Sequence, residues 1–524
     1  MQVDQFPSSD LLHFDKLIQD YLAKNEKLSP FISHFPSIEN FRPVIAGKQL
    51  STSHRRILSD VLTEQYRNHH PSAAVSENID LLREEKTFTV TTGHQLCLFT
   101  GPLYFIYKML STIKLSRSLK KSYPDLNIVP VYWLASEDHD FDEINHAFFY
   151  GKKLEWHTEE KGAVGPMDVT TVLLLVDELK LLLGNDAASI VDLLRSAYTL
   201  KDLSNATRHI VNHLFGKYGL VILDANHPGL KGLFRHVMKD ELFHGSAYEA
   251  VSASSAALQM AGYKTQVNPR GINLFYHDEN LRARIERSGD KWKVIDTELA
   301  FSESELNDLL NSHPEKFSPN VIMRPLYQET ILPNLAYIGG PGELAYWLQL
   351  RSLFEKHETH FPILVLRDSA MLITEKTQSR LEKIGIAAVD LFKDRNDLIK
   401  GMVNASEASL EKEKEALNSL FDDISARMKA VDVTLENAAR GEGQRQLSAL
   451  EGLEKKMLKA LKAKEDTRIQ QLEKLMTELF PDGQMQERHD NFFQYSLQFG
   501  EDLLDVLLNA FDPLANRLTI VSAV

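Results

Sequence analysis

The feature that most constrains the fold is a proline-free stretch, 402–480, that is rich in Glu, Lys, Leu and Ala. Its first part repeats an apolar residue every seven positions, at Val403, Leu410, Leu417, Ile424 and Val431. A looser stripe follows at steps of three and four, at Leu447, Leu450, Leu453, Met457 and Leu461. A seven-residue apolar spacing is typical of helices that pack along another helix. We therefore predict two long helices, broken around 431–434, that form an antiparallel coiled-coil hairpin; an ordinary helical bundle in the core is the alternative.

The chain upstream of this stretch alternates between strand and helix patterns. Residues 87–91 are β-branched or aromatic, as in a strand, and 103–121 carries apolar residues at nearly helical period. Residues 128–134 form a near-continuous apolar run, which is typical of a buried parallel strand. A second strand, turn, helix and strand pattern covers 335–366. This alternation favours an α/β fold with a mostly parallel sheet.

The composition changes near Leu391, and this change sets the domain boundaries that we predict. We assign 1–395 to the α/β core and 396–480 to the coiled-coil arm. The middle of the core, about 150–330, is less regular, and we interpret it as insertions plus strands that return to one sheet. The last segment, 481–524, is aromatic and apolar again, and we predict that it packs back on the core.

Charge and cysteine content argue against several classes of function. The chain carries 59 Lys and Arg against 73 Asp and Glu, a net charge of −14. Binding to a nucleic-acid backbone usually needs a basic surface, so we expect no nucleic-acid partner. No apolar run reaches about 18 residues and the N-terminal residues lack a secretion signal, so we expect no membrane partner. The single cysteine, Cys97, cannot form an internal disulfide or a cysteine-built zinc site, which favours the cytoplasm.

Ligands of open α/β sheets bind beyond the carboxyl ends of the strands, and three segments follow predicted strands. The first is the loop 92–102, whose glycines permit close approach of the backbone to a ligand. The helix after it offers free N–H groups to a phosphate, and His94 could bind a phosphate or stabilise negative charge as an imidazolium. Neither a P-loop nor Gly-x-Gly-x-x-Gly is present, and a structural glycine loop is the alternative. We interpret Cys97 as a small buried side chain rather than a nucleophile.

The second segment, 136–146, contains seven ionisable residues in eleven positions, directly after an apolar strand. Burying so many charges is costly unless they bind something, and a substrate amine, a metal or general acid–base catalysis would each explain them. The alternative is a solvated helix N-terminus. The candidate catalytic residues are Asp138, His139, Asp140 and Glu143. The candidate substrate-binding residues are Ser136 and Glu137. Strict metal-ligand spacing is absent, so we assign no metal ligands.

The third segment is the turn Gly339-Gly340-Pro341-Gly342-Glu343, followed by Tyr346 and Trp347. One interpretation is a backbone cradle in which Glu343 faces a ligand. The alternative is a tight strand-to-helix turn with an acidic residue in its first turn. The candidate substrate-binding residues here are Gly340, Gly342, Glu343 and Tyr346.

At these three segments the sequence resembles the cysteine ligase family of bacillithiol biosynthesis. The residues that carry the resemblance are Thr92-Gly93-His94-Gln95 with Phe99-Thr100-Gly101-Pro102-Leu103-Tyr104, Trp133 through His146, and Gly339-Gly340-Pro341-Gly342-Glu343. The arm and the aromatic tail fit this family too, so that the resemblance covers essentially the whole chain. The usual first motif of the family reads Gly-Gln-Gln, whereas this chain has Gly93-His94-Gln95.

The resemblance implies a Rossmann-like core with insertions, similar to that of class I aminoacyl-tRNA synthetases. Their His-Ile-Gly-His signature would be replaced by 93–95, and their Lys-Met-Ser-Lys-Ser signature by the segment 367–380. The implied reaction joins the carboxyl group of cysteine to the amine of glucosaminyl-malate, giving bacillithiol, with ATP as the expected activating cosubstrate. The residues implied to bind the nucleotide are Gly93, His94, Gln95, Thr100, Gly101 and Tyr104.

Other functions stay open from the sequence. One is an amino-acid-activating enzyme with another small acceptor, and a second is a non-catalytic coiled-coil scaffold on an inactive Rossmann-like domain. A third is a metal-dependent hydrolase built on Asp138, His139 and Asp140. The second helix of the arm is the longer one, and its excess apolar surface predicts a homodimer; an arm that folds back as a lid is the alternative.

Overall fold

The computed structural model describes residues 1–403 and 408–523, which form two compact units. The first unit contains Met1–Leu372 and Gln484–Val521, and the second contains Ile373–Gly483 with Ser522–Val524. The second unit thus begins upstream of position 396, where the composition places the start of the arm. The range predicted for the arm includes 404–407, which lie outside the described residues.

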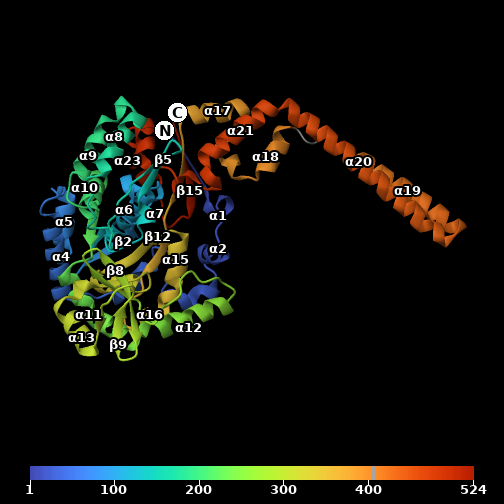
Figure 1. Cartoon of the computed structure of the whole chain (residues 1–524). Coiled ribbons are helices and arrows are strands. Elements are labelled where there is room, and N and C mark those ends of the chain that lie inside the picture. The colour runs from blue at the N-terminus through green and yellow to red at the C-terminus, as the bar shows by residue number, and fades with distance from the viewer. Residues whose placement is uncertain (404–407, 524) are drawn as a thin grey trace. The chain divides into compact units, whose positions relative to one another are not determined.

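The first unit is built on a five-stranded parallel sheet with the order β13-β12-β2-β3-β6. Figure 1 labels two of these strands, β2 and β12. The strands are β2 (Thr87–His94), β3 (Asn127–Leu134), β6 (Val221–Asp224), β12 (Asn334–Gly339) and β13 (Ile363–Leu366). Numbered along the chain, their spatial order is 3-2-1-4-5, which is that of a Rossmann-like fold. The predicted α/β fold with a parallel sheet is therefore confirmed. The order reverses between β2 and β12, and ligands of such sheets bind at the carboxyl ends of the strands at this reversal.

The strand and helix patterns of the sequence account for the centre of this sheet. Helix α6 (Tyr104–Ser122) connects β2 to β3, and its last turn carries Lys120 and Lys121, where positive charge suits the helix dipole. The second pattern gives β12, α15 (Pro341–Trp347), a 3-10 turn, α16 (Arg351–Lys356) and β13. One buried cluster joins α6 to β2, β3, β12 and β13. It contains Phe41, Val44, Phe88, Val90, Leu115, Leu119, Ile128, Leu335, Ala336, Ile338, Ile363 and Val365.

The insertion at 150–330 differs from our expectation, because most of its strands do not return to the central sheet. A separate antiparallel sheet has the order β10-β9-β8-β7-β11. Its strands are β7 (Leu274–Asp278), β8 (Leu281–Ser288), β9 (Lys291–Val294), β10 (Ala300–Phe301) and β11 (Phe317–Pro319). Two-residue turns join β7 to β8 and β8 to β9, and Asn280 and Gly289 adopt positive φ there. Turns this short connect only neighbouring antiparallel strands, so that these strands form hairpins of their own.

The remaining elements of the first unit surround the two sheets. Its other helices include α1 (Ser8–Leu11), α2 (Lys16–Leu22), α3 (Phe41–Gly47), α4 (Thr52–Tyr66), α5 (Ala73–Leu81), α7 (Phe141–Ile144), α8 (Val172–Leu183), α9 (Ala188–Tyr198), α10 (Leu203–Phe215), α11 (Pro228–His244), α12 (Ser246–Met260), α13 (Glu303–Ser312), α14 (Met323–Ile331), α22 (Phe492–Phe499) and α23 (Leu503–Ala510). A small hairpin pairs β4 (His146–Phe149) with β5 (Lys152–Glu155). A third sheet has the order β1 (Gln2–Pro7), β15 (Arg517–Ser522) and β14 (Ser369–Ile373). Lys114 of α6 donates to the carbonyl oxygens of Leu508 and Asn509, which holds α23 against α6.

The second unit contains the long helices that the sequence predicts. They are α19 (Glu411–Val431) and α20 (Glu436–Lys464), which lie side by side (Figure 1). Asp432 accepts a hydrogen bond from the backbone of Thr434 at 2.8 Å and so starts the turn between them. A Cβ at Gly443 would lie 3.0 Å from Phe421, so that glycine permits close contact of the two helices. The unit also contains α17 (Glu375–Ile384), α18 (Arg395–Met402) and α21 (Asp466–Leu479).

Within 1–403 and 408–523, no helix has both the length and the apolar character that a membrane span requires.

Candidate functional site

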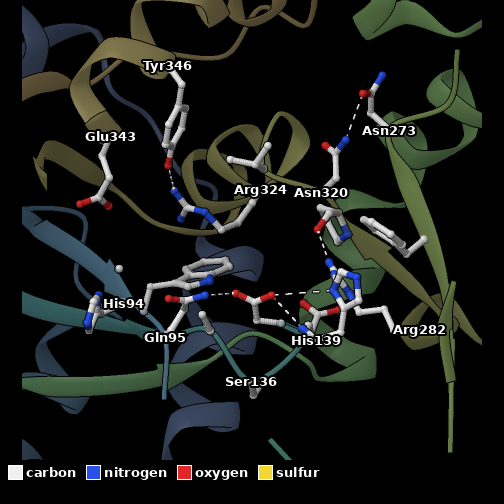
Figure 2. Close-up of a pocket in the computed structure, with 18 of the residues that line it drawn as sticks. His94, Gln95, Ser136, His139, Asn273, Arg282, Asn320, Arg324, Glu343 and Tyr346 are labelled. Carbon is white, nitrogen blue, oxygen red and sulfur yellow. Dashed lines mark hydrogen bonds and ion pairs between the residues drawn. The ribbon is translucent and has the colours of Figure 1, made fainter. Parts of the chain in front are cut away.

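A cavity of about 720 Å³ lies at the carboxyl ends of β2, β3 and β12, where the strand order reverses (Figure 2). Its lining also includes residues of α6, α14 and α15, and residues of β7 and β8 from the antiparallel sheet. The predicted site residues that line the cavity are Gly93, His94, Gln95, Tyr104, Ser136, Glu137, Asp138, His139, Glu143, Glu343 and Tyr346. The predicted residues outside its lining are Thr100, Gly101, Asp140, Gly340 and Gly342.

The part of the glycine loop that leaves the cavity has a packing role. Phe99, Thr100 and Gly101 adopt positive φ of 52°, 74° and 63°, and this turns the chain away from the end of β2. A Cβ at Gly101 would lie 2.6 Å from the Cβ of Cys97, so that close packing explains the glycine. Asn491 donates to the carbonyl oxygens of Phe99 and Gly101 at 2.7 and 2.8 Å. Thr100 and Gly101 therefore match the structural alternative for this loop.

His94 lines the cavity in an environment that disfavours the imidazolium form. Its ring packs against Tyr104 and Phe105, with centroids at 5.3 and 5.1 Å. Burial, with a contribution from Lys108, lowers the pKa of His94 to about 3, so that the ring is neutral at neutral pH. The Sγ of Cys97 lies 3.7 Å from His94 Nε2, and burial raises the pKa of this thiol to about 12. Cys97 is buried and protonated, as the interpretation of a small buried side chain predicts.

Two carboxylates of the acidic segment meet at one side-chain amide. Gln95 Nε2 donates to Asp138 Oδ2 at 2.9 Å and to Glu143 Oε2 at 2.7 Å. Asp138 Oδ1 accepts from the backbone N–H groups of His139 and Asp140, at 2.7 and 3.3 Å. These bonds fix Asp138 and Glu143 next to each other at the cavity, where they can bind an ammonium group or accept a proton.

His139 is held by an arginine that the sequence analysis did not identify. Arg282 Nη1 lies 2.6 Å from His139 Nδ1, and because arginine only donates, Nδ1 must be the unprotonated nitrogen. Arg282 also donates to Ser318 Oγ and to the carbonyl oxygen of Pro319, and it stacks 4.0 Å from the centre of the Phe275 ring. Burial, followed by the charge of Arg282, lowers the pKa of His139. His139 therefore offers its Nε2–H as a donor, whereas the neighbouring carboxylates are groups that can accept a proton.

Glu137 and Ser136 line the cavity, and each is held by a side chain from another element. Lys231 of α11 is completely buried; its Nζ lies 2.5 Å from Glu137 Oε1 and 2.7 Å from the carbonyl oxygen of Phe317. Burial lowers the pKa of Lys231, and the Glu137 carboxylate opposes this shift. Ser136 Oγ donates to Asp224 Oδ1 at 2.5 Å. Glu137 is thus paired with a buried lysine at the cavity.

Glu343 lines the cavity with its hydrogen-bonding capacity largely used. Its Oε2 lies 2.5 Å from Lys108 Nζ and 2.9 Å from the backbone N of Gly340, and its Oε1 accepts from Tyr337 at 2.6 Å. Burial raises the pKa of this carboxyl, but Lys108 and the hydrogen bonds outweigh burial and lower it. Lys108 also donates to the carbonyl oxygen of Gly93 at 2.6 Å. Glu343 thus caps α15 and pairs with α6, and its side chain also lines the cavity.

The basic side of the cavity was missed by the sequence analysis. Its arginines are Arg270, Arg282, Arg284 and Arg324, with Asn268, Asn273 and Asn320 beside them. Arg282 and Arg284 are two positions apart on β8 and so point to the same face of the strand. The alternation Arg-Ala-Arg at 282–284 was a sequence signal for this wall, but nothing in the sequence placed the strand at the end of the central sheet. Arg324 lies in helix α14, and no sequence pattern indicated that it faces a cavity.

The cavity combines carboxylates with guanidinium groups. Guanidinium groups bind carboxylate and phosphate oxygens, and carboxylates bind amines. In the part of the chain that the structure describes, no group of three or more His, Cys, Asp or Glu side chains is arranged to hold a metal ion. The cavity is therefore suited to a small substrate that carries both acid and amine groups.

Comparison with known proteins identifies the family. The model of the "Bacillithiol biosynthesis BshC, N-terminal Rossmann-like domain" matches residues 1–368, and that of the corresponding C-terminal coiled-coil domain matches 370–523. A protein of Flavobacterium psychrophilum named "Putative cysteine ligase BshC" is 44% identical, and the match covers 97% of each chain. Proteins of the same name from Flavobacterium johnsoniae and Chlorobaculum tepidum are 43% and 33% identical, with 97% and 94% of this chain covered, and 98% and 94% of theirs. The chain thus belongs to the BshC family of bacillithiol biosynthesis, a family of cysteine ligases.

Proposed function

We propose that this cysteine ligase joins the carboxyl group of cysteine to the amine of glucosaminyl-malate, and that ATP activates the carboxyl group. The observation that carries the proposal is the pairing of carboxylates with arginines in one cavity. Glucosaminyl-malate has one amine and two carboxylates. Asp138 and Glu143 suit the amine, and Arg270 and Arg284, both exposed at the cavity, suit the carboxylates.

The bond-forming step needs a free amine. We infer that the amine nitrogen attacks the activated acyl carbon and that its proton moves to Asp138 or Glu143. Gln95 holds both carboxylates at hydrogen-bond distance from its own amide, so that each stays oriented toward the same point. A carboxylate positioned in this way contributes about 100-fold to 10,000-fold to a proton-transfer step.

Activation is needed because a carboxylate is a poor acyl donor. In the proposed first step, an oxygen of the cysteine carboxylate forms a bond to the α-phosphorus of ATP and pyrophosphate leaves. In the second step the amide forms and AMP leaves. The reversal of strand order between β2 and β12 supports nucleotide binding at this cavity. His94 is neutral and Lys108 is paired with Glu343, so that the positive charge for phosphates comes from the arginines.

The experiment is an assay of the purified protein with cysteine and glucosaminyl-malate, with and without ATP. The expected result is bacillithiol formation that requires ATP and yields one AMP per product. Methyl glucosaminide, which has the amine but lacks both carboxylates, is the matched acceptor control and should react at least tenfold more slowly at low concentration. Equal rates with both acceptors would contradict the proposed acceptor, and product without ATP would contradict the proposed activation.

A further inference from the structure

Arg324 is a cation in the cavity wall with no anionic partner. It lies in the first turn of α14; its Nη1 donates to Gln328 Oε1 at 3.0 Å and its Nη2 to the hydroxyl of Tyr346 at 3.2 Å. Both partners are uncharged. Among residues 1–403 and 408–523, no carboxylate oxygen lies within 4.0 Å of this guanidinium group.

The surroundings partly shield Arg324 from bulk water, and Glu343 is a carboxylate whose charge acts on it without forming an ion pair. The ring centres of Tyr337 and Trp133 lie 5.5 and 6.0 Å from its guanidinium carbon. The end of β2 approaches closely, because a Cβ at Gly93 would lie 3.6 Å from Arg324 Nη1 and 3.3 Å from the Tyr337 hydroxyl. Enclosing a charge in this way costs free energy unless an opposite charge compensates it.

Several buried cations of the same unit have carboxylate partners, whereas buried Arg208 donates only to oxygens of Ile222 and Gln65 and lies outside the cavity lining. Lys108 and Lys231 each have a carboxylate oxygen at 2.5 Å, and Lys48 has one at 3.1 Å. Arg55 makes no such ion pair, but it donates four hydrogen bonds to main-chain carbonyl oxygens. Arg324 uses only two of the five N–H groups of its guanidinium, and the group lines the cavity. An anion from outside the chain would supply the missing partner.

We propose that Arg324 binds the carboxylate of the cysteine donor and is a catalytic residue of the ligase. This inference rests on the proposed function and adds the residue that holds the acyl group. Arg324 and Gln95 extend into the same cavity from different elements, α14 and the end of β2 (Figure 2). Gln95 orients the two carboxylates that hold the acceptor amine. This amine must reach the acyl carbon of cysteine, and Arg324 is placed to bind the carboxylate oxygens on that carbon. Tyr346 acts as a positioning residue, because its hydroxyl accepts from Arg324.

The partial enclosure of Arg324 favours binding of the cysteine donor over the larger acceptor. Arg270 and Arg284 are exposed and can reach the two carboxylates of a larger, branched acceptor. Arg324 lies near the rings of Tyr337 and Trp133 and is less exposed than Arg270 and Arg284, so we assign it to the smaller substrate. The same guanidinium could bind a phosphate, so that the experiment must separate a carboxylate from a nucleotide.

The test compares two ligands that differ only in the carboxylate. Cysteine and cysteamine, which lacks that group, are titrated separately into the wild-type protein and into Arg324→Gln by calorimetry. The wild-type protein should bind cysteine about tenfold to a hundredfold more tightly than cysteamine, and this ratio should fall close to one in Arg324→Gln. Tyr346→Phe should reduce the ratio partially, and Arg324→Lys should retain part of it.

A control variant, titration of ATP and an assay of product formation make the outcome decisive. Arg287→Gln removes an exposed arginine that also stacks on an aromatic ring, Trp292, but lies outside the cavity lining, and it should keep the full ratio. Should Arg324→Gln fail to fold, Tyr346→Phe and Arg324→Lys carry the comparison. A full ratio in the Arg324 and Tyr346 variants would overturn the inference, and so would weaker ATP binding with unchanged cysteine binding. If the wild-type protein forms product, the proposed function stands whichever result the variants give. A wild-type protein that binds no cysteine and forms no product would contradict both the proposed function and the role of Arg324.

Discussion

Lys108 and Glu343 form an ion pair with 2.5 Å between Nζ and Oε2 in the wall of the cavity. The pair joins α6, which follows the first glycine segment, to α15, which follows the third. The side chain of Lys108 is only 3% exposed, so that its charge depends on Glu343 for compensation. Two segments that the sequence analysis treated as separate ligand sites are thus connected to each other.

The first prediction follows from this pair. Glu343→Gln should lower the free energy of unfolding of the first unit by about 3 kcal/mol, because it leaves Lys108 buried without a counter-ion. The measurement is urea denaturation followed by tryptophan fluorescence, since all four tryptophans lie in the first unit. Glu355→Gln breaks the exposed pair with Arg351 and should change stability by less than about 0.5 kcal/mol. Equal effects of the two substitutions would argue against a compensating role for Glu343.

The second prediction concerns the acidic segment. Asp138→Asn and His139→Ala should fold normally yet lose thiol product, Asp138→Asn by about 100-fold or more because it removes the proposed proton acceptor. Asp140→Asn is the matched control, since Asp140 lies in the same segment but outside the cavity lining, and it should stay close to wild type. Turnover is measured on each purified variant with saturating substrates. Wild-type rates in both Asp138→Asn and His139→Ala would show that the assignment is wrong.

The order of elements could be predicted from the sequence because each depends on neighbouring residues. The apolar run at 128–134 is β3, and the glycine turn at 339–342 connects β12 to α15, because these patterns reflect local burial. The insertion could not be placed in this way. Its strands have ordinary strand patterns, and only the two-residue turns at 279–280 and 289–290 indicate that they pair with each other.

The site was predicted in part for a related reason. The carboxylates of 136–143 are adjacent in sequence and lie at the end of a predicted strand, so that they could be found together. Arg282 reaches His139 across 143 positions of sequence, and Arg324 reaches Tyr346 from another helix. Such contacts depend on how the two sheets pack, which no local pattern encodes. Glu343 was predicted to face a ligand, and it lines the cavity, but its partner Lys108 was not identified because the two residues are 235 positions apart in sequence.

The third prediction concerns pH. Histidine in the unfolded chain has a pKa near 6.5, whereas burial lowers the pKa of His94 in the folded protein to about 3. The unfolded state therefore binds a proton that the folded state does not, and stability from this group is complete above pH 6.5 and is lost as the pH falls toward 3. Between pH 6.5 and 5 the loss should be about 2 kcal/mol. His94→Gln removes the titrating group, so that the free energy of unfolding of the variant, measured by denaturation, should fall less over this range. An equal fall in the wild-type protein and the variant would contradict the role of His94.

The fourth prediction concerns the nucleotide. ATP should slow backbone hydrogen exchange at 93–95 and near Tyr104 or Glu343, because these residues line the cavity at the strand-order reversal. At ATP concentrations near ten times the dissociation constant, amides that exchange through opening of the ATP-binding site should exchange about tenfold more slowly. Thr100 and Gly101, which lie outside the lining, should change less. Protection elsewhere, with both of these segments unchanged, would place the nucleotide at another site.

The last prediction is that the arm mediates a homodimer. Helix α20 has 29 residues and α19 has 21, so that part of the longer helix has no partner within the hairpin. Large apolar side chains of these helices and their turn remain exposed, namely Leu420, Val431, Val433, Leu435, Leu453 and Met457. A second copy would cover them, and twofold pairing is the commonest arrangement.

Light scattering should give about twice 59.6 kDa for the intact protein. Deletion of 402–480, or the double substitution Leu453→Glu with Met457→Glu, should give monomer, whereas Leu181→Glu on the exposed surface of α8 should leave the dimer intact. A monomeric full-length protein at micromolar concentration would contradict the dimer and leave an arm that closes as a lid.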